Sequence, residues 1–358
     1  MTPMKNIGAG LLFATLLMLN QPCQSNVVAD QSDIESPDSM AWTTAKAKLK
    51  VEVRIDGGKW SKRPGHTPKK GQSVELRVKP IPEAQIRWYL IFADLNTFYE
   101  NANPPWKPDA YKWVGFDTIN YHRIELTQHR DKWQFEPLSD DMWSSVRPAL
   151  AAAGHSDQYY HGTLGTFRFQ AVVKAGQKIL RSPGLEDIGD KGISPSVTRL
   201  SVRSGEGVIG ALSSFYNVPG IFGSVTYQSQ HHIGVDCADV LVAAWGQWKR
   251  RRVKRNYNVD MVVGKLKTRS SAELSGGAPD KTLTWGKDVK AGDFIAVKYS
   301  GARRFQHIGA LAGDTDKDGI LSAGDHVMHA GPHPLKSEPL SGGGFDGHVA
   351  ILNSGGKL

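Results

Sequence analysis

The chain has 358 residues and two cysteines, and its 44 Lys and Arg against 35 Asp and Glu give a formal net charge of +9. At about 150 residues per domain, this length exceeds one ordinary domain and predicts two, each with its own core. The positive charge favours polyanionic partners.

The first 29 residues have the pattern of a secretory signal peptide. A lysine precedes an apolar run from Ile7 to Leu19, which is too short to span a bilayer as a mature helix. Small residues allow cleavage after Ser25 or after Ala29, and the pattern does not choose between them. A retained anchor or a lipid on Cys23 are the alternatives, but the residues before Cys23 make a poor acylation box. We expect a periplasmic or secreted protein with no integral membrane span after cleavage.

Removal of this leader would leave Cys237 as the only thiol and would exclude an intramolecular disulfide. A lone cysteine in an exported protein is exposed to oxidation, so its presence is easier to understand if the thiol is used chemically. An inert, buried cysteine is the alternative. Outside the cytoplasm the positive charge predicts envelope polymers or anionic lipid headgroups as partners, and not nucleic acid.

Residues 30–45 are polar and aperiodic, which indicates a flexible linker. The region from 46 to 203 then predicts an all-β domain, because apolar and polar residues alternate in several short segments. These segments are 49–53, 73–78, 85–92, 166–173 and 197–202. Their spacing resembles an immunoglobulin-like sandwich without its cysteine pair, with Trp88 as the core aromatic residue.

An aromatic-rich insertion, about residues 100–160, interrupts these strands and contains a short helical stretch at 142–152. Its large aromatic residues are Trp106, Trp113, Trp133, Trp143, Tyr159 and Tyr160. Exposed tryptophans can stack on sugar faces, which would suit a glycan-binding surface. Aromatic core packing is the alternative and, without geometry, the favoured interpretation.

A second domain is predicted over residues 204–358, with α+β order. We expect helices at 208–216 and 236–249 and strands at 293–299, 305–312 and 326–330. A basic run at 249–255 follows the second helix, where cations complement the helix dipole. We interpret this run as a solvated helix end.

Cys237 follows a Gly-Val-Asp turn and begins an apolar, helix-forming stretch. Unpaired backbone N–H groups and the helix dipole at such a position favour thiolate over thiol, and thiolate is the nucleophile. The same N–H groups can hold an oxyanion. The sequence therefore predicts a reactive thiol at a helix start.

Two downstream strands carry histidines that could serve this thiol. His307 lies in a predicted strand that follows a Gly-Asp strand, and a third strand ends near His329. Because strand residues three apart face opposite sides, only one of His326 and His329 can face His307. A metal site of His326, His329 and His333 is the alternative, disfavoured because a carboxylate partner is missing.

These three segments resemble the NlpC-type cysteine peptidases, which are papain-like enzymes of bacterial envelopes. The resemblance covers about residues 205–335 and implies Cys237 as nucleophile, His307 as base and His329 as the residue that orients the base. The Ser-Gly pair that follows the family's cysteine is Ala-Asp here, and the upstream glycine-aromatic segment is only loosely echoed. Tyr227 and Asp236 are the candidates for contact with substrate or oxyanion.

The segment 314–325 lies between the two histidine strands and has the spacing of a calcium loop. Its predicted ligands are Asp314, Asp316, Asp318, the carbonyl of Ile320 and Asp325, with a glycine at loop position 6. It resembles the dockerin-type variant of the EF-hand loop. An acidic turn without an ion is the alternative. We expect structural Ca²⁺ to close this insertion between the two histidines.

Together these features predict an exported cysteine hydrolase that cleaves amide or peptide bonds, with peptidoglycan stem peptides as the expected substrate. The mechanism would use a Cys-His-His constellation and a thioester acyl-enzyme. Within the same chemistry, the alternatives are a CHAP-like amidase, an acyltransferase and a toxin against a competitor's wall. From another class, the alternative is a calcium-dependent envelope- or glycan-binding protein with an inactive papain-like domain.

Overall fold

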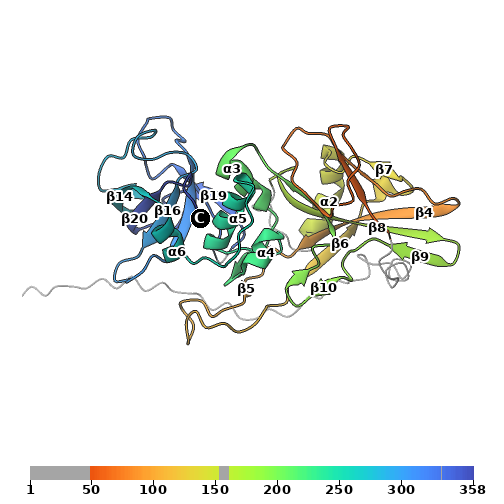
Figure 1. Cartoon of the computed structure of the whole chain (residues 1–358), viewed down its shortest axis with the longest axis horizontal. Coiled ribbons are helices and arrows are strands. Elements are labelled where there is room, and N and C mark those ends of the chain that lie inside the picture. Colours follow the sequence, from red (N-terminus) through yellow and green to blue (C-terminus); the bar gives the residue numbers. More distant parts are fainter. Residues whose placement is uncertain (1–48, 153–160, 332) are drawn as a thin grey trace, which may run out of the picture.

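The computed structural model describes residues 49–152, 161–331 and 333–358, which form two units that lie side by side (Figure 1). The predicted signal peptide, the linker and the two tyrosines at 159 and 160 lie outside the described residues. Among the described residues, no helix combines the length and the apolar character that a membrane crossing requires.

The N-terminal unit consists mainly of two sheets. The smaller has the order β1 (Glu52–Ile55), β3 (Val74–Arg77), β7 (Gln134–Phe135). The larger has the order β2 (Gly65–His66), β12 (Thr198–Val202), β8 (Gly165–Ala175), β4 (Ala84–Ala93), β6 (Tyr121–Glu125), and β9 (Lys178–Arg181) also pairs with β8. All these neighbours are antiparallel except β2 and β12. The five alternating segments of the sequence therefore correspond to β1, β3, β4, β8 and β12.

Both sheets contribute side chains to one core, together with the helix α2 (Asp140–Ala152). Trp88 is fully buried there, as the sequence predicted, and its ring lies 4.8 Å from that of Phe135 in an edge-to-face contact. Its indole N–H donates to the carbonyl of Lys132 at 2.8 Å, so the one polar atom of the ring is satisfied.

The aromatic residues of the insertion divide into two groups. Trp133 and Trp143 pack against the sandwich core, as the favoured interpretation expected. Trp106 and Trp113 are 65% and 47% exposed, so core packing does not explain them. The insertion also contains β5 (Tyr99–Glu100), which pairs in parallel with β13 (Ile221–Phe222) of the second unit. This pairing ties the insertion to the C-terminal unit.

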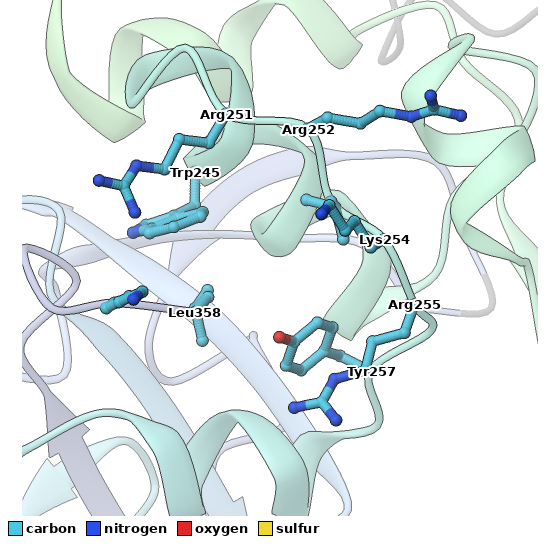
Figure 2. Close-up of a pocket in the computed structure, with 9 residues that line it drawn as sticks. Trp245, Arg251, Arg252, Lys254, Arg255, Tyr257 and Leu358 are labelled. Carbon is cyan, nitrogen blue, oxygen red and sulfur yellow. The ribbon is translucent and has the colours of Figure 1, made fainter.

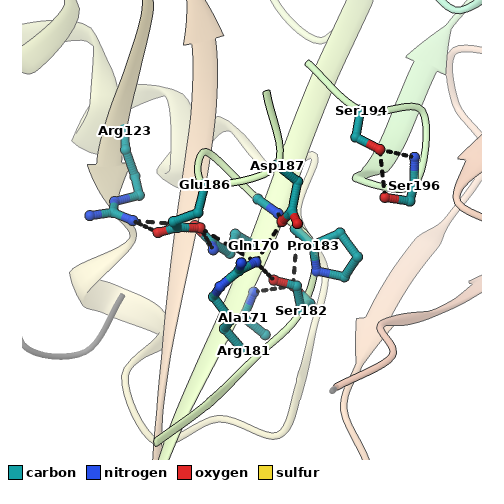
Figure 3. A network of polar contacts seen from close by, with 11 residues as sticks. Arg123, Gln170, Ala171, Arg181, Ser182, Pro183, Glu186, Asp187, Ser194 and Ser196 are labelled. Atoms are coloured by element: carbon teal, nitrogen blue, oxygen red, sulfur yellow. Dashed lines mark hydrogen bonds and ion pairs between the residues drawn. The ribbon is translucent and has the colours of Figure 1, made fainter. Parts of the chain in front are cut away.

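A polar network fastens the turn after β9 to the large sheet (Figure 3). Arg123 pairs with Glu186 at 2.7 Å, and the side-chain amide of Gln170 donates to the same carboxylate at 2.6 Å. Arg181 pairs with Asp187 in the same turn. Because these polar groups find their partners within the protein, we interpret the network as having a structural role. A short hairpin, β10 (Ile188–Gly189) and β11 (Gly192–Ile193), follows it.

The C-terminal unit contains a seven-stranded antiparallel sheet. Its order is β15 (Ala278–Pro279), β14 (Thr268–Ser275), β20 (Gly347–Leu352), β16 (Phe294–Lys298), β17 (His307–Gly313), β18 (His326–His329), β19 (Lys336–Pro339). Its helices are α3 (Gly207–Leu212), α4 (Thr226–Gln230), α5 (Cys237–Trp248) and α6 (Val259–Lys265), and a 3₁₀ turn at Ser213–Phe215 ends the helix predicted for 208–216.

The helix α5 packs on one face of this sheet and thereby places its first residue. Val240, Leu241 and Ala244 share a core with Phe294 of β16 and Ile308 of β17. Every residue of α5 from Ala238 to Gly246 is buried, so the helix is enclosed on all sides and not along a single stripe. The opposite face of the sheet has its own core, formed mainly by other strand residues and by loops. This burial holds the start of α5 against β17.

Candidate functional site

Cys237 is the first residue of α5, and its free thiol is half-buried. Asp236 is the N-cap of the helix, and its Oδ1 accepts the backbone N–H groups of Ala238 at 3.1 Å and Asp239 at 2.8 Å. This is the usual way in which an aspartate satisfies unpaired N–H groups at a helix start. The sequence therefore placed Cys237 correctly at the start of a helix. For Asp236, which was predicted to contact substrate or oxyanion, the contact that the structure shows is this helix cap.

The electrostatics of the thiol differ from the sequence-based expectation. Burial, followed by the charge of Asp236, raises the pKa of Cys237 well above its ordinary range, and Asp239 adds to this shift. Backbone N–H groups of Ile308 and Ala238 lower the pKa only in part. The expected preference for thiolate at the helix start is therefore wrong, because burial and two nearby carboxyl groups outweigh the N–H groups. The net effect favours the protonated form of Cys237.

The start of α5 lies against β17, the strand that carries His307. Cys237 packs against the core that contains Ile308, the residue next to His307, and the backbone N–H of Ile308 lowers the pKa of the thiol. Between the described side chains, no hydrogen bond joins the thiol to the His307 ring itself. Catalytic hydrogen bonds are often long or poorly aligned without substrate. The geometry therefore brings the start of α5 next to the strand that carries His307.

A chain of hydrogen bonds leads outward from His307. Its Nε2 lies 2.8 Å from Nδ1 of His329, and Nε2 of His329 lies 2.6 Å from Oε1 of Glu338. Lys336 pairs with the same carboxylate oxygen at 2.7 Å. His329 is therefore the histidine that faces His307. His326 is turned away, with its Nδ1 3.4 Å from the hydroxyl of Ser337.

Sequence analysis did not find Glu338. It lies on β19, which pairs with β18 in a register that sets Lys336 opposite His329. The carboxylate reaches His329 from this neighbouring strand. Nothing in the spacing of a Lys-Ser-Glu-Pro segment marks an acid as a histidine partner, so only the strand register reveals it.

The carboxylate sets the tautomers of both imidazoles. Glu338 paired with Lys336 is ionised and can only accept, so Nε2 of a neutral His329 carries the proton and donates to it. Nδ1 of His329 then accepts from Nε2–H of His307. The proton of the His307 ring is thus on Nε2, which leaves the lone pair on Nδ1 free to accept another proton.

Burial keeps these groups in the required protonation states. Burial lowers the pKa of His307 to about 3, and the charges of His329 and His333 act in the same direction. Burial also lowers the pKa of His329. For Glu338, burial alone would raise the pKa, but hydrogen bonds from His329 and Lys336 bring it to about 2. At neutral pH both rings are neutral and the carboxylate is charged.

Two buried carboxyl groups lie beside the thiol. Burial raises the pKa of Asp236 to about 6 despite its hydrogen bonds from the helix N–H groups. Burial and the charge of Asp236 raise the pKa of Asp239 well above its ordinary value. The hydroxyl of Ser224 donates to Asp239 at 2.9 Å and accepts from the backbone N–H of Asp236 at 3.0 Å. Ser224 thus links the carboxylate of Asp239 to the backbone N–H of Asp236.

Tyr227, predicted to contact substrate, is 40% exposed and stands edge-on to His231, with ring centroids 4.8 Å apart. Tyr299 and Tyr111, by contrast, were not predicted. Burial raises the pKa of Tyr299 to about 12, and the charges of Cys237 and Tyr111 contribute, so these groups lie within electrostatic reach of one another. Tyr111 belongs to the insertion, which therefore comes near Tyr299.

A cavity of about 540 Å³ adjoins this region. Its lining residues are Tyr111, Asn258, Val259, Asp260, Ala302, Arg303, Arg304, Phe305 and Gln306. Gln306 is next to His307 in the chain, so the cavity lies beside the predicted base. It has the size of a ligand site, since such clefts measure roughly 300–1,000 Å³.

The predicted calcium loop connects β17 and β18. Carboxylate oxygens of Asp314, Asp316 and Asp325 lie within 4.8 Å of one another, while Asp318 is not part of this group and accepts the N–H of Ile320 at 2.7 Å. The backbone N–H of Asp318 lowers the pKa of Asp316, but desolvation and nearby carboxyl groups produce a net rise. Converging hard oxygen donors fit Ca²⁺.

A basic cavity of about 470 Å³ lies at the far end of α5 (Figure 2). Figure 2 shows Trp245, Tyr257 and Leu358 beside the basic residues Arg251, Arg252, Lys254 and Arg255. They belong to the run that follows the helix, where the sequence predicted a helix end. A helix of 12 residues is about 18 Å long, so this cavity is remote from Cys237.

The candidate site therefore consists of Cys237, His307, His329 and Glu338, with Tyr299 and Tyr111 nearby. Its first three members come from the sequence and its fourth from the structure. No family model, curated protein or solved structure matches the chain.

Proposed function

We propose that this chain is an exported cysteine hydrolase that cleaves amide or peptide bonds, with peptidoglycan stem peptides as its substrate. The observation that supports it most is the packing of Cys237 against the core that contains Ile308, the neighbour of His307 in β17. This packing puts the thiol at the start of α5, next to the strand that carries His307. His307 in turn begins the chain of hydrogen bonds through His329 to Glu338. This arrangement suits a papain-like, NlpC-type enzyme, which the sequence motifs also resemble.

The first half of the reaction transfers the thiol proton to Nδ1 of His307 while the sulfur attacks the carbonyl carbon. Proton transfer accompanies attack because the resting thiol is protonated. The backbone N–H of Cys237, which has no hydrogen-bond partner within the described ranges, is directed to the developing oxyanion. His307 then gives its proton to the leaving amine, and a thioester remains.

The second half hydrolyses the thioester. His307 takes a proton from water, the resulting hydroxide adds to the thioester carbon, and the tetrahedral intermediate expels the thiolate. His307 returns its proton to the sulfur and the carboxylic acid leaves. His329 stays neutral throughout and, with Glu338, stabilises the positive charge that His307 carries transiently.

The proposed setting is the periplasm or the outside of the cell, and the proposed partner is peptidoglycan or another envelope polymer. The positive net charge supports attraction to anionic polymers. The cavity beside His307, flanked by arginines and by Tyr111 of the insertion, offers space for an anionic peptide. No role with nucleic acid is proposed.

Digestion of purified sacculi tests the proposal. The full chain should release muropeptides whose masses show a cut stem-peptide bond, and Cys237→Ala should release none at an unchanged melting temperature. His326→Ala is the matched control and should digest normally. It removes a histidine that lies on β18 with His329 but takes no part in the chain of hydrogen bonds. Equal digestion by Cys237→Ala would overturn the proposal. Cleavage at the lactyl amide would identify a CHAP-like amidase instead.

A second candidate function is supported by the exposed aromatic residues of the insertion and by the high pKa of Cys237. In this alternative the chain binds envelope glycans through Trp106 and Trp113 in a calcium-dependent manner, and the papain-like domain is inactive. Sedimentation with sacculi separates the two. Under this alternative, Trp106→Ala weakens sedimentation, Ile188→Ala serves as an exposed apolar control, and Cys237→Ala changes nothing because there is no turnover.

We also propose that Ca²⁺ bound at Asp314, Asp316 and Asp325 is a structural cofactor. The loop follows β17 and leads directly into β18, the strands that carry His307 and His329. Neutralising the mutual repulsion of its carboxylates would hold the connection between the two strands in one conformation. The ion has no part in the proposed bond cleavage.

A further inference from the structure

A second group of metal-capable side chains lies at the outer end of the histidine chain. One ligand atom each from His329, His333 and Glu338 lies within 4.8 Å of the other two. In a tetrahedral zinc site with bonds of about 2.0–2.1 Å, ligand atoms are about 3.3 Å apart. Small movements of the three side chains would therefore bring them to bonding distance.

The atoms available for coordination are well defined. Nδ1 of His333 lies 2.8 Å from the carbonyl of Pro334, so Nε2 is the free nitrogen of that ring. The rings of His329 and His333 are 5.0 Å apart and nearly perpendicular, at 85°. Nε2 of His329 already contacts the carboxylate of Glu338. The three donors thus belong to one nearly buried histidine, one half-buried histidine and one half-buried acid.

This donor set corrects the metal alternative considered from sequence. His326 is not part of the group, and Glu338 supplies the carboxylate that the sequence did not reveal. Two imidazole nitrogens and one carboxylate oxygen suit Zn²⁺ and related divalent transition metals, whereas Ca²⁺ and Mg²⁺ prefer oxygen donors alone. The group therefore differs in chemistry from the loop at 314–325.

We propose that His329, His333 and Glu338 bind a divalent transition metal ion of the Zn²⁺ class, and that the bound ion switches off the cysteine site. The binding half of this inference stands on geometry alone. The regulatory half rests on the proposed hydrolase function.

The switch follows from the tautomers of the two rings. A metal ion on Nε2 of His329 leaves Nδ1 as the only position for that ring's proton, so Nδ1–H now donates to His307. Nε2 of His307 becomes the acceptor, and the proton of that ring moves to Nδ1. Each ring keeps one proton and none is released. The nitrogen that should accept the thiol proton then has no free lone pair.

Lys336 is the built-in competitor of the ion. Its ammonium group lies 2.7 Å from the same oxygen of Glu338. A metal ion must displace this ammonium group before the carboxylate can coordinate it. Removal of the lysine charge should therefore tighten metal binding, which is a gain that unfolding cannot imitate.

The binding test uses the full chain carrying Cys237→Ala, so that neither the thiol nor turnover contributes. Zn²⁺ is titrated against a chromophoric chelator with millimolar Ca²⁺ present to occupy the acidic loop. One Zn²⁺ per chain is expected. His333→Ala and Glu338→Gln should each weaken binding by about tenfold or more. His326→Ala, the control on the same strand, should leave the affinity unchanged.

In the same background, Lys336→Met should tighten Zn²⁺ binding several-fold. Absence of Zn²⁺ binding, or binding that is indifferent to His333→Ala and Glu338→Gln, would overturn the site. Equal weakening by His326→Ala would also overturn it, because it would assign the ion to other histidines.

The regulatory half is tested in the chain with Cys237 intact, by sacculus digestion over a range of Zn²⁺ concentrations. Digestion should fall to background as the site fills and return when a chelator is added. In His333→Ala, with rates expressed relative to that variant's own zinc-free rate, half inhibition should need a higher Zn²⁺ concentration. Stimulation by Zn²⁺ would overturn the switch. If no digestion occurs at any Zn²⁺ concentration, the hydrolase proposal fails while the titration with Cys237→Ala still decides the metal site.

Discussion

Nε2 of His307 and Nδ1 of His329 lie 2.8 Å apart, so each ring uses one nitrogen for the other. The second nitrogen of His329 is used by Glu338, and the second nitrogen of His307 has no hydrogen-bond partner among the described residues. The direction of this chain is set at its outer end, because a carboxylate can only accept. The residue farthest from the sulfur therefore determines which nitrogen of the base is available.

Glu338→Gln should lower kcat for stem-peptide cleavage by about a hundredfold while KM stays nearly unchanged. Glutamine offers an N–H donor as well as a carbonyl, so it no longer enforces the Nε2–H tautomer of His329. The assay uses chelator-treated protein with calcium restored. Glu273→Gln is the matched control, because Glu273 pairs with His348 at 2.8 Å elsewhere on the same sheet. An unchanged kcat in Glu338→Gln would show that tautomer control is unimportant.

Alkylation of Cys237 by iodoacetamide should be slow at pH 7 and should rise about tenfold per pH unit up to pH 9. Burial and the carboxyl groups of Asp236 and Asp239 raise the pKa of the thiol, and Tyr299 is the other titratable group that interacts with it from the sheet side. Mass spectrometry of the intact chain follows the reaction. Asp239→Asn should speed alkylation at pH 8. A rate that levels off below pH 8 would mean that the thiolate is already formed.

Calcium at a hundredfold excess over its dissociation constant should stabilise the fold by about 2.7 kcal/mol and raise the melting temperature by roughly 5 °C. Asp316→Asn should abolish this rise, because Asp316 is one of the three converging carboxylates. Asp325 is less suitable for the test, since it also accepts the N–H groups of Thr315 and Ser322. Asp280→Asn serves as the control. The same calcium-induced rise in Asp316→Asn would remove the loop as the binding site.

The contribution of Asp236 to stability should fall as pH rises from about 4 to about 6. Folding raises the pKa of Asp236 from 3.8 to about 6, so this carboxyl group holds more protons in the folded chain than in the unfolded chain in this window, opposite to His307, whose pKa folding lowers to about 3. Asp239→Asn removes the neighbouring charge and should therefore shift the melting temperature at pH 7 upward relative to that at pH 4, compared with the parent chain. Differential scanning calorimetry measures the melting temperature at each pH, and Asp190→Asn, at an exposed position, is the control. An identical pH profile for Asp239→Asn and the parent chain would exclude repulsion within this pair.

Local pattern was enough for the elements that carry the site. The start of α5 follows from an aspartate cap before an apolar stretch, and the strands β1, β3, β4, β8, β12, β16, β17 and β18 follow from alternation and apolar runs. The strands β14, β19 and β20 of the C-terminal sheet were not predicted. Cys237 and His307 could be named because their segments have recognisable local signatures. The burial of Trp88 is also a local inference, since an aromatic residue in a long alternating strand faces a core.

Contacts between distant segments could not be obtained in this way. Glu338 reaches His329 because β18 and β19 pair in one particular register. Tyr111 comes near Tyr299 because β5 of the insertion pairs with β13 of the other unit. A shift of one residue in either pairing would turn different side chains toward the site, and short segments carry too little information to choose the register.

The sequence by itself determined which residue types stand at a helix start and on two strands, because hydrogen-bond caps and hydrophobic periodicity act over a few residues. The tertiary structure decided their protonation states and their partners. Desolvation depends on what packs around a group in the fold, and at Cys237 burial, with the charges of the neighbouring Asp236 and Asp239, outweighs the influence of the helix end.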